Sequence, residues 1–487
     1  MHKYFCQKNK MGIFYSILYY LLLILYFYTI AVCVSVVLLD NRSPAKSILW
    51  MVVLIMLPAV GLIFYIFFGR DYRKKKIVQS NIQHQILPKP EYALGMKDLI
   101  TSDLPRHLQK TARLLFKNSG SHPYIDTKVE VLIDGAETFE RIFTDIEQAK
   151  KHIHVDFFII KDDTVGNEMR RLLIRKAQEK VRVRVIYDYL GGFNLSEAYI
   201  TSLRNAGVYI QPFLPFNRKF GYNKINYRNH RKLVVIDGKI GYTGGINIAN
   251  RYIFGNRLGK WRDTSVRLEG PAVHGLQNLF LTDWQFVDNK AVIDEKYFPE
   301  PKTFSQNVVQ IVSSGPDTDW ETILQGIITV FSNARKNIFI HTPYFLPPES
   351  LMTAIEMAAL SGVDVRLMVP YKTDTVLATA ASSSYFQRVM EAGVRIYLYK
   401  QNFLHSKAIT VDNEIGIVGT ANMDIRSFEQ NFEVNAFIYD ENVAINLRDA
   451  FEKDAEFCEE IDLETWKKRR PIQRIKESLA RLFSPIL

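Results

Sequence analysis

Two long apolar runs open the chain and set it apart from the mixed sequence that follows. The first covers residues 11–39 and the second residues 48–68, with a short polar turn between them. Each run is long enough to cross the hydrocarbon core of a bilayer, about 30 Å thick, as a helix. A cleaved signal peptide is the alternative for the first run. However, the run is about twice as long as the usual apolar region of a signal peptide, and a second apolar run follows it directly. We therefore predict a membrane anchor over residues 1–76 that contains two transmembrane helices.

After a polar linker at residues 77–121, short β-type runs alternate with helical patterns, which is typical of α/β domains. The same order then occurs a second time. The predicted strands lie at residues 152–160, 181–188 and 208–213 in the first half and at 337–345, 363–369 and 394–399 in the second, with helical stretches between them, such as 167–179 and 197–205. The repetition predicts two copies of one α/β fold, which we assign to residues 122–305 and 306–487.

Positive charge is distributed unevenly around the apolar runs. Lysines precede the first run and a cluster of lysines and arginines follows the second, whereas the turn between them holds only Arg42 and Lys46. Because basic residues favour the cytoplasmic side, both ends of this hairpin, and with them the remaining chain, are predicted to lie in the cytoplasm. The formal net charge of +11 implies attraction to an anionic partner. In a tethered chain the nearest anionic surface is the lipid headgroup layer, although charge alone also allows nucleic acid.

Each half of the chain carries the same constellation of polar residues. The two copies are His230-x-Lys232-x4-Asp237-x6-Gly244-x2-Asn247 and His405-x-Lys407-x4-Asp412-x6-Gly419-x2-Asn422. A single histidine two residues from a lysine is usually part of a solvated strand. Five positions that recur with identical intervals, at equivalent places in two repeats, indicate a functional site instead.

These residue types suit chemistry on a phosphodiester. Side chains at i and i+2 of a strand share a face, so each imidazole and its lysine ammonium can converge on one phosphate. Each asparagine, following a glycine turn, adds a hydrogen bond to a phosphoryl oxygen. If the two half-sites face each other, one neutral histidine attacks phosphorus while the other, protonated, donates to the departing alkoxide, and the lysines offset charge on the oxygens.

Neither a metal nor another cofactor is expected. The sequence offers no carboxylate cage for a cation. Its three cysteines, Cys6, Cys33 and Cys458, are scattered without a C-x-x-C pair or a neighbouring histidine cluster, which argues against a zinc site or a disulfide framework and fits a reducing compartment.

Two further carboxylates are candidates for orienting the histidines. An attacking imidazole needs its other nitrogen held by an acceptor, which fixes the tautomer. Alignment of the halves beyond the asparagines places Asp263 opposite Glu433, and we predict that these two residues orient His230 and His405. The alternative is that they are ordinary polar residues at the start of a strand, because the alignment contains a five-residue length difference.

The motif aspartates allow either a structural or a catalytic role. Asp237 and Asp412 lie an odd number of residues from Lys232 and Lys407, so an unbroken strand would point them to the opposite face. A structural role, such as tying down the following turn, is for them at least as well founded as a catalytic one.

The duplicated H-x-K-x4-D pattern resembles the phospholipase D superfamily and, within it, the bacterial cardiolipin synthases. The closer resemblance covers nearly the whole chain. It rests on the paired apolar spans followed by Phe68-Gly69-Arg70-Asp71, and on Asn250-Arg251-Tyr252, Trp261-Arg262-Asp263, Ser313-Ser314-Gly315-Pro316 and Arg481-Leu482-Phe483-Ser484-Pro485.

This resemblance implies two phospholipase D-like α/β sandwich domains related by pseudo-twofold symmetry, in a multi-pass protein of the bacterial plasma membrane. It implies that two phosphatidylglycerols react to give cardiolipin and glycerol, that anionic membrane lipid is the partner surface, and that nucleic acid is not bound. By family analogy, His230 takes the phosphatidyl group, and His405 first protonates the glycerol and then deprotonates the second phosphatidylglycerol. The catalytic set that it implies is His230, Lys232, Asp237, His405, Lys407 and Asp412.

Other functions stay open at this point. A phospholipase D hydrolase, or a phosphatidyltransferase that uses another alcohol, shares every residue above. A superfamily nuclease is disfavoured by the transmembrane hairpin, because nucleic acid needs no lipid tether. A catalytically inactive lipid-binding scaffold is disfavoured by the intact histidines, since anionic headgroups require cations but not two matched imidazoles.

Two peripheral segments have a pattern that suits lipid contact. Residues 213–229 mix aromatic and basic side chains and predict either an interfacial lid or an ordinary surface loop. Near the C-terminus, Ile472, Ile475, Leu479 and Leu482 share one helical face. Packing of that stripe on its own domain is the favoured interpretation, with contact to anionic lipid as the alternative.

Overall fold

A computed structural model of the chain describes residues 15–24, 26–31, 34–35, 44–57, 61, 64–65, 104–215, 226–288, 294–304 and 307–485. The chain forms two compact units, residues 1–74 with 217–226 and residues 75–216 with 227–487. In the first unit, helix α2 spans Pro44–Met56. None of the helices built from the described residues has the length and apolar character needed to cross a membrane. Parts of both predicted spans, and most of the candidate lid, lie outside the described residues.

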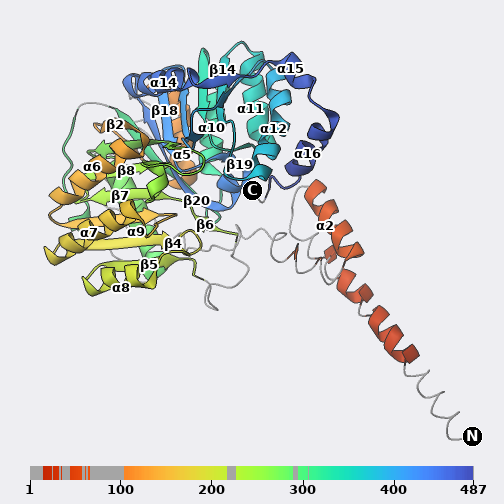
Figure 1. Cartoon of the computed structure of the whole chain (residues 1–487), viewed down its shortest axis with the longest axis horizontal. Helices are drawn as coiled ribbons and strands as arrows, with labels where there is room; N and C mark the ends of the chain where they lie inside the picture. The colour runs from red at the N-terminus through yellow and green to blue at the C-terminus, as the bar shows by residue number, and fades with distance from the viewer. Residues whose placement is uncertain are drawn as a thin grey trace, which may run out of the picture. The chain divides into compact units, whose positions relative to one another are not determined.

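The second unit contains two large sheets (Figure 1). The two sheets share one strand order. The first sheet runs β2 (Lys128–Ile133), β10 (Thr264–Glu269), β8 (Ile240–Gly244), β7 (Lys232–Ile236), β3 (His152–Phe157), β4 (Arg182–Asp188) and β5 (Tyr209–Phe213). The second runs β11 (Val308–Ser314), β20 (Asn431–Tyr439), β18 (Ile415–Gly419), β17 (Ala408–Val411), β12 (Asn337–His341), β14 (Asp364–Pro370) and β15 (Arg395–Tyr399), with β1 (Pro123–Tyr124) and β21 (Cys458–Glu460) added at its edges. The chain thus builds one seven-stranded topology twice.

Helices cover both faces of each sheet, so the central strands are buried throughout. All five residues of β7 and all nine of β20 are buried, as expected for strands enclosed on two sides. The helices of the first half are α6 (Asp134–Gln148), α7 (Thr164–Gln178), α8 (Glu197–Asn205) and α9 (Val273–Asp288). Those of the second are α10 (Thr322–Ser332), α11 (Glu349–Leu360), α12 (Val376–Glu391) and α14 (Glu441–Ala455).

The segment predicted as a polar linker contains a packed helix. Helix α5 (Arg106–Ser119) buries Leu108, Ala112 and Leu115, which join the hydrophobic core of the second half. The spacing of these three residues places them on one helical face. The assignment of residues 77–121 to a linker therefore does not describe their final part. Strand β1, placed by sequence in the first domain, likewise pairs with β11 of the second sheet.

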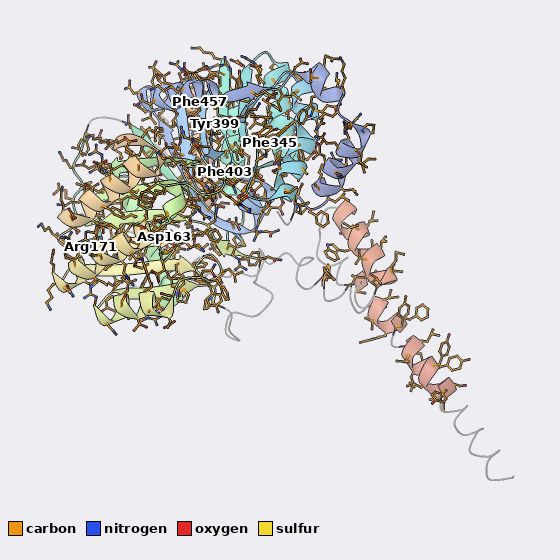
Figure 2. All side chains as sticks on the ribbon, viewed as in Figure 1. Asp163, Arg171, Phe345, Tyr399, Phe403 and Phe457 are labelled. Atoms are coloured by element: carbon orange, nitrogen blue, oxygen red, sulfur yellow. The ribbon has the colours of Figure 1, made fainter. Side chains whose placement is uncertain are left out.

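Two short parallel pairs tie the halves together. Strand β6 (Arg228–Asn229) pairs with the beginning of β20, and β16 (Phe403–Leu404) pairs with β9 (Trp261–Arg262). Phe403, labelled in Figure 2, comes from the second half. It packs into the hydrophobic core of the first half, beside Trp261. Each half therefore inserts the segment that precedes its own histidine into the other half.

The C-terminal helix does not pack as expected. Helix α16 (Pro471–Arg481) buries Glu477 and Ala480. The predicted apolar stripe points away from the domain, with Ile475 55% and Leu479 56% exposed. The favoured interpretation, packing of that stripe on its own domain, is wrong, because a narrow polar and small-residue face makes the contact instead.

Candidate active site

Each motif histidine stands just before its own strand and is held by the opposite half. The backbone N–H of His230 donates to the carbonyl oxygen of Phe432 at 2.9 Å, and that of His405 donates to the carbonyl oxygen of Arg262 at 2.8 Å. The expectation that each histidine and its lysine share one regular strand is wrong: Lys232 begins β7 but His230 precedes it, and both His405 and Lys407 precede β17. The position of each histidine thus depends on contacts between the halves.

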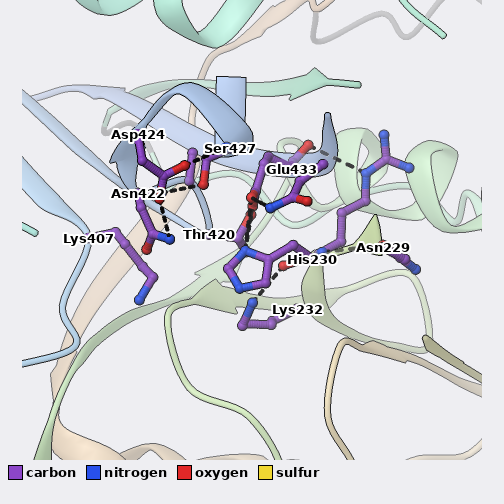
Figure 3. Close-up of polar contacts among 12 residues, drawn as sticks. Asn229, His230, Lys232, Lys407, Thr420, Asn422, Asp424, Ser427 and Glu433 are labelled. Atoms are coloured by element: carbon purple, nitrogen blue, oxygen red, sulfur yellow. Dashed lines mark hydrogen bonds and ion pairs between the residues drawn. The ribbon is translucent and has the colours of Figure 1, made fainter. Parts of the chain in front are cut away.

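The two predicted carboxylates bind the histidines in a crossed arrangement. Nδ1 of His230 lies 2.8 Å and 3.0 Å from the two carboxylate oxygens of Glu433, and Nδ1 of His405 lies 2.7 Å from Oδ2 of Asp263. Each histidine is therefore bound by the carboxylate of the other half (Figure 3 shows the His230 pair). Because Nδ1 is engaged, Nε2 is the nitrogen left for chemistry.

The two carboxylates have unequal surroundings. Glu433 also accepts hydrogen bonds from the Thr420 hydroxyl at 2.5 Å and the Asn431 amide at 3.2 Å. Asp263 accepts the backbone N–H of Thr264 at 2.8 Å. The position that corresponds to Thr420 in the first half is Gly245, which has no hydroxyl to donate. A side chain would not fit there, because an added Cβ would lie 2.1 Å from Oδ1 of Asp263. Burial raises the pKa of Asp263 to about 7, whereas His230 and the hydrogen-bond donors around Glu433 outweigh burial and lower the pKa of that carboxyl.

Burial also lowers the pKa values of the histidines and lysines of the site. Loss of water lowers the pKa of His230 to about 4 and, with the nearby lysine charges, holds the pKa of His405 well below its ordinary value. It lowers the pKa of Lys232 to about 7 and that of Lys407 to about 8. Each ammonium donates to the backbone oxygen of its own histidine, at 2.6 Å for Lys232 and 2.5 Å for Lys407. Since an ammonium has three protons, each lysine keeps donors for a phosphate.

The histidines line one pocket of about 360 Å³. Aromatic and apolar side chains form much of its wall, together with polar groups from both halves. Its lining comprises Phe158, Ile159, Arg228, His230, Asn247, Arg251, Tyr252, Trp261, Tyr344, Leu346, Asp374, Thr375, Ala378, His405, Asn422, Asp424, Arg426 and Asn431. Within the described part of the chain, no three histidine, cysteine or acidic side chains cluster in a way that would hold a metal ion.

Both motif asparagines lie in this pocket with part of their amide group already engaged. The amide nitrogen of Asn247 donates to the Tyr252 hydroxyl at 2.7 Å, and that of Asn422 donates to Asp424 at 3.0 Å. The side-chain oxygen of Asn247 accepts the backbone N–H of Ile159 at 3.1 Å. An amide nitrogen carries two protons, so one donor of each asparagine is left for a substrate oxygen.

The motif aspartates make structural contacts away from the pocket. Asp237 accepts the three successive backbone N–H groups of residues 150–152, at 2.7–2.8 Å. Asp412 does the same with residues 335–337, at 2.7–3.0 Å. Both adopt a left-handed backbone, with φ of 54° and 56°. Each aspartate thus fixes the start of the strand beside its motif, and neither lies among the pocket residues.

Two arginines of the pocket, Arg251 and Arg426, were not predicted from the sequence. Each follows its motif asparagine by four positions, so the repeated pattern extends to Asn247-x3-Arg251 and Asn422-x3-Arg426. This repeated interval is the sequence signal that marks both arginines.

Known proteins are similar to this chain over most of its length. The family model described as "Cardiolipin synthase, PLD-like domain" matches residues 142–284 and 327–455, and that described as "Phospholipase_D-nuclease N-terminal" matches residues 24–70. The cardiolipin synthase of Geobacillus sp. (strain WCH70) is 41% identical over 459 residues, which cover 93% of this chain and 91% of that protein. The major cardiolipin synthase ClsA of Bacillus subtilis (strain 168) is 39% identical over 476 residues, which cover 96% of this chain and 99% of that protein. The solved phosphatidylserine synthase of Haemophilus influenzae Rd KW20 shares the fold, with a TM-score of 0.57 at 18% identity over 78% of this chain and 100% of that chain.

Proposed function

This chain belongs to the bacterial cardiolipin synthases of the phospholipase D superfamily, and on that premise we propose that its pocket transfers a phosphatidyl group from one phosphatidylglycerol to another. The products are cardiolipin and free glycerol, and the enzyme is a phosphatidyltransferase with the phospholipase D-like α/β fold. The observation that carries the proposal is the pair of histidines that line one pocket, each bound through Nδ1 to a buried carboxylate.

In the first step, the Nε2 lone pair of His230 attacks the phosphorus of the donor phosphatidylglycerol. A P–N bond forms while the P–O bond to the glycerol headgroup breaks, and the departing oxygen takes a proton from Nε2 of His405. Because the pKa of Asp263 is raised by burial to about 7, the Asp263–His405 pair retains a proton at neutral pH. The two motif lysines offset charge on the nonbridging oxygens. Family analogy assigns the nucleophile to the first motif.

In the second step, the glycerol hydroxyl of another phosphatidylglycerol attacks the phosphatidyl-histidine. His405 accepts the proton of that hydroxyl, the P–O bond of cardiolipin forms and the P–N bond to His230 breaks. Both histidines return to their starting states. Atoms and charge balance without a metal or a redox partner, so the residues named are a sufficient set.

Transfer rather than hydrolysis depends on keeping water away from the intermediate. An enzyme held at a bilayer meets lipid alcohol at high local concentration. The pocket wall contributed by Phe158, Tyr252, Trp261 and Leu346 offers little to hold water. These two features support a lipid acceptor over water.

Attachment to the membrane is part of the same proposal. The apolar runs at residues 11–39 and 48–68 form a transmembrane hairpin, and the catalytic domains lie on the cytoplasmic side, where anionic lipid is the partner surface. The match of residues 24–70 to an N-terminal family module supports such an anchor. The catalytic repeats divide near residues 122–305 and 306–487, apart from α5 and β1, which pack with the second.

The decisive experiment is an assay of the purified full chain with radiolabelled phosphatidylglycerol. Cardiolipin and glycerol in equal amounts are the expected products. Phosphatidic acid as the main lipid product would identify a hydrolase, and transfer only to an added alcohol would identify another phosphatidyltransferase. Either result would overturn the proposal.

A further inference from the structure

Arg251 is a cation of the pocket that the two-step mechanism leaves unused. It follows Asn247 by four residues, in the short helix η4 (Asn250–Tyr252), and lines the pocket. Its guanidinium carbon lies 4.3 Å from the centre of the Trp261 ring. The Trp261 ring in turn lies 4.9 Å from the imidazole of His405. Arg251 is therefore fixed by stacking on the His405 side of the pocket.

The hydrogen-bonding capacity of Arg251 is not used up by the protein. Its Nε atom is buried and has no hydrogen-bond partner among the described residues. Nor does any carboxylate of the described residues form an ion pair with it, whereas Arg231 and Arg262 are paired with Asp283 and Asp454. A guanidinium that lines a pocket, stacks on an aromatic ring and lacks a carboxylate suits an anionic ligand.

The proposed reaction requires such a cation. Two phosphodiesters occupy the pocket when the second phosphatidylglycerol attacks: the one bonded to His230 and the intact one of the acceptor. Lys232 and Lys407 each donate to the backbone oxygen of their own histidine, and in the proposed mechanism they serve the reacting phosphate. A second anion brought into a partly buried site needs its own positive charge.

We propose that Arg251 forms the subsite for the phosphodiester of the acceptor phosphatidylglycerol. This inference rests on the proposed function and names the part of the site that selects an anionic lipid alcohol over water or a neutral alcohol. The guanidinium binds the intact phosphate while the terminal hydroxyl of the same headgroup reaches phosphorus, next to His405. Arg426 holds the equivalent position in the second half, at the same interval from its asparagine, so the site is pseudosymmetric for a product that itself contains two phosphates.

The test compares Arg251→Gln with Arg251→Lys and with Arg257→Gln, an exposed arginine of the same loop. In Arg251→Gln, glycerol release in a single turnover should stay close to wild type, while cardiolipin formation falls about 10- to 100-fold and phosphatidic acid rises. The Michaelis constant for acceptor phosphatidylglycerol should increase more than kcat falls. Arg251→Lys should recover part of the loss, and Arg257→Gln should behave as wild type.

An assay with a neutral acceptor tests the role of Arg251 separately from the proposed phosphatidyl transfer. Transfer to ethanol, which has no phosphate, should be equal in wild type and Arg251→Gln. An unchanged ratio of cardiolipin to phosphatidic acid in Arg251→Gln, or an equal loss of glycerol release and of ethanol transfer, would overturn the role of Arg251. Absence of cardiolipin from the wild-type reaction would instead overturn the proposed function.

Helix α16 supports a second, independent inference about the surface of the enzyme. The four apolar residues of its outer face are all exposed: Ile472 58%, Ile475 55%, Leu479 56% and Leu482 73%. Its inner face packs on α12, where Ala480 joins Ala381 and Leu346 in one hydrophobic cluster. Leu346 also lines the active-site pocket. The exposed stripe thus belongs to a helix that backs directly onto the wall of the pocket.

The charges of this helix indicate what covers the stripe. Four exposed basic residues stand at its ends and flanks, namely Arg470, Arg474, Lys476 and Arg481. Glu477, which is buried, is neutralised by Arg469 at 2.6 Å. We infer that α16 lies in the interface of an anionic phospholipid surface, with its apolar face inserted and its basic flanks at the headgroups. Docking there would bring the pocket close to its lipid substrates.

Photocrosslinking identifies the occupant of the stripe. A photoreactive benzoylphenylalanine replaces Ile475 in the full chain, reconstituted in vesicles that contain radiolabelled phosphatidylglycerol. The matched control carries it at Leu360 of α11, which is 72% exposed. Lipid adducts should form at position 475 and not at 360. A crosslink to a second copy, or to another segment of the same chain, would overturn the inference, as would equal lipid labelling at both positions.

Discussion

The carboxylates beside the two histidines distinguish two otherwise matched half-sites. Glu433 accepts hydrogen bonds from Thr420 and Asn431, and its pKa is lowered, so in the proposed mechanism it would stabilise the positive charge that His230 gains as a P–N bond forms. Asp263 has its pKa raised by burial to about 7 and therefore shares a proton with His405. The inequality favours His230 as nucleophile and His405 as acid, which the motif sequences alone do not decide.

This assignment predicts the outcome of trapping experiments. Substitution of His230 by Ala should abolish both glycerol release and covalent labelling by radiolabelled phosphatidylglycerol, because no comparable nucleophile remains in that half-site. Substitution of His405 by Ala should slow formation of the intermediate but also block its breakdown, so some labelled protein persists. The measurement is acid-labile label retained after rapid denaturation.

Two outcomes would contradict it in different ways. Label on His405 in the His230→Ala protein, with none in His405→Ala, would reverse the two roles and leave the two-step mechanism intact. Failure to trap label in any variant would count against the covalent intermediate itself.

The dependence of kcat/KM on pH follows from the same environments. Burial lowers the pKa of His230 to about 4, so the nucleophile stays neutral down to that pH and the acid limb should lie near 4 rather than near 6.5. Burial lowers the pKa of Lys232 to about 7 and raises that of Asp263 to about 7, so a cation and the transferable proton are both lost as pH rises through 7. We expect kcat/KM to fall by about tenfold or more per pH unit above that point. A plateau that extends to pH 10 would show that these buried groups titrate normally.

Of the residues that recur at matched intervals, the two histidines and the two asparagines line the pocket. Asp263 and Glu433, which correspond in the alignment beyond the asparagines, bind the histidines. The sequence could not predict that each histidine binds the carboxylate of the other half, because this pairing depends on how two distant segments meet in space. Arg251 could have been found from its interval alone.

At the scale of elements, the strands next to the histidines are anchored by the motif aspartates. Asp237 receives three backbone N–H groups at the start of β3, and Asp412 receives three at the start of β12. A carboxylate that accepts several N–H donors contributes more than a neutral acceptor does, and an amide in its place would turn an NH₂ group toward those donors. Their contacts therefore belong to folding.

Removal of this anchor should lower stability without altering the chemistry. Asp237→Asn is expected to reduce the free energy of unfolding by about 2 kcal/mol, seen as a lower midpoint in thermal unfolding of the detergent-solubilised chain. Asp412→Asn should have a similar effect. The rate per folded molecule should stay within a few-fold of wild type in both. A loss of turnover comparable with that of His230→Ala, in a protein of unchanged stability, would assign these aspartates to catalysis.

Regular elements were predicted well, and elements shared between halves were not. The helix predicted at residues 197–205 has those bounds in α8, because an N-capping Ser196 and an apolar face mark it locally. Strands β6, β9 and β16 have two residues each and exist only as pairs across the halves. Such short segments carry no period of their own, so local pattern cannot reveal them.

At the scale of the whole molecule, each half depends on the other for its active site. His230 needs Glu433, and His405 needs Asp263. A buried ion pair reinforces this junction: Arg262, next to Asp263, binds Asp454 of α14 at 2.8 Å. Both repeats must therefore lie on the same side of any membrane that the chain crosses.

Because both repeats must lie on the same side of the membrane, the charge pattern of the N-terminus predicts the location of the entire catalytic unit. Basic residues flank the two apolar runs on their outer sides: Lys3, Lys8 and Lys10 precede them, and Arg70 and residues 73–76 follow them, whereas the turn holds only Arg42 and Lys46. We expect a hairpin oriented by these charges to keep residues 77–487 in the cytoplasm. Protease added to sealed, right-side-out cells should therefore leave the catalytic region intact, and the same protease should digest it in inverted vesicles or after the membrane is permeabilised.

An epitope inserted in the turn at residues 40–46 serves as the matched control, since it should be reached from outside. Digestion of the catalytic region in intact cells, with that epitope protected, would reverse the topology and move the phosphatidyl transfer to the outer face of the membrane.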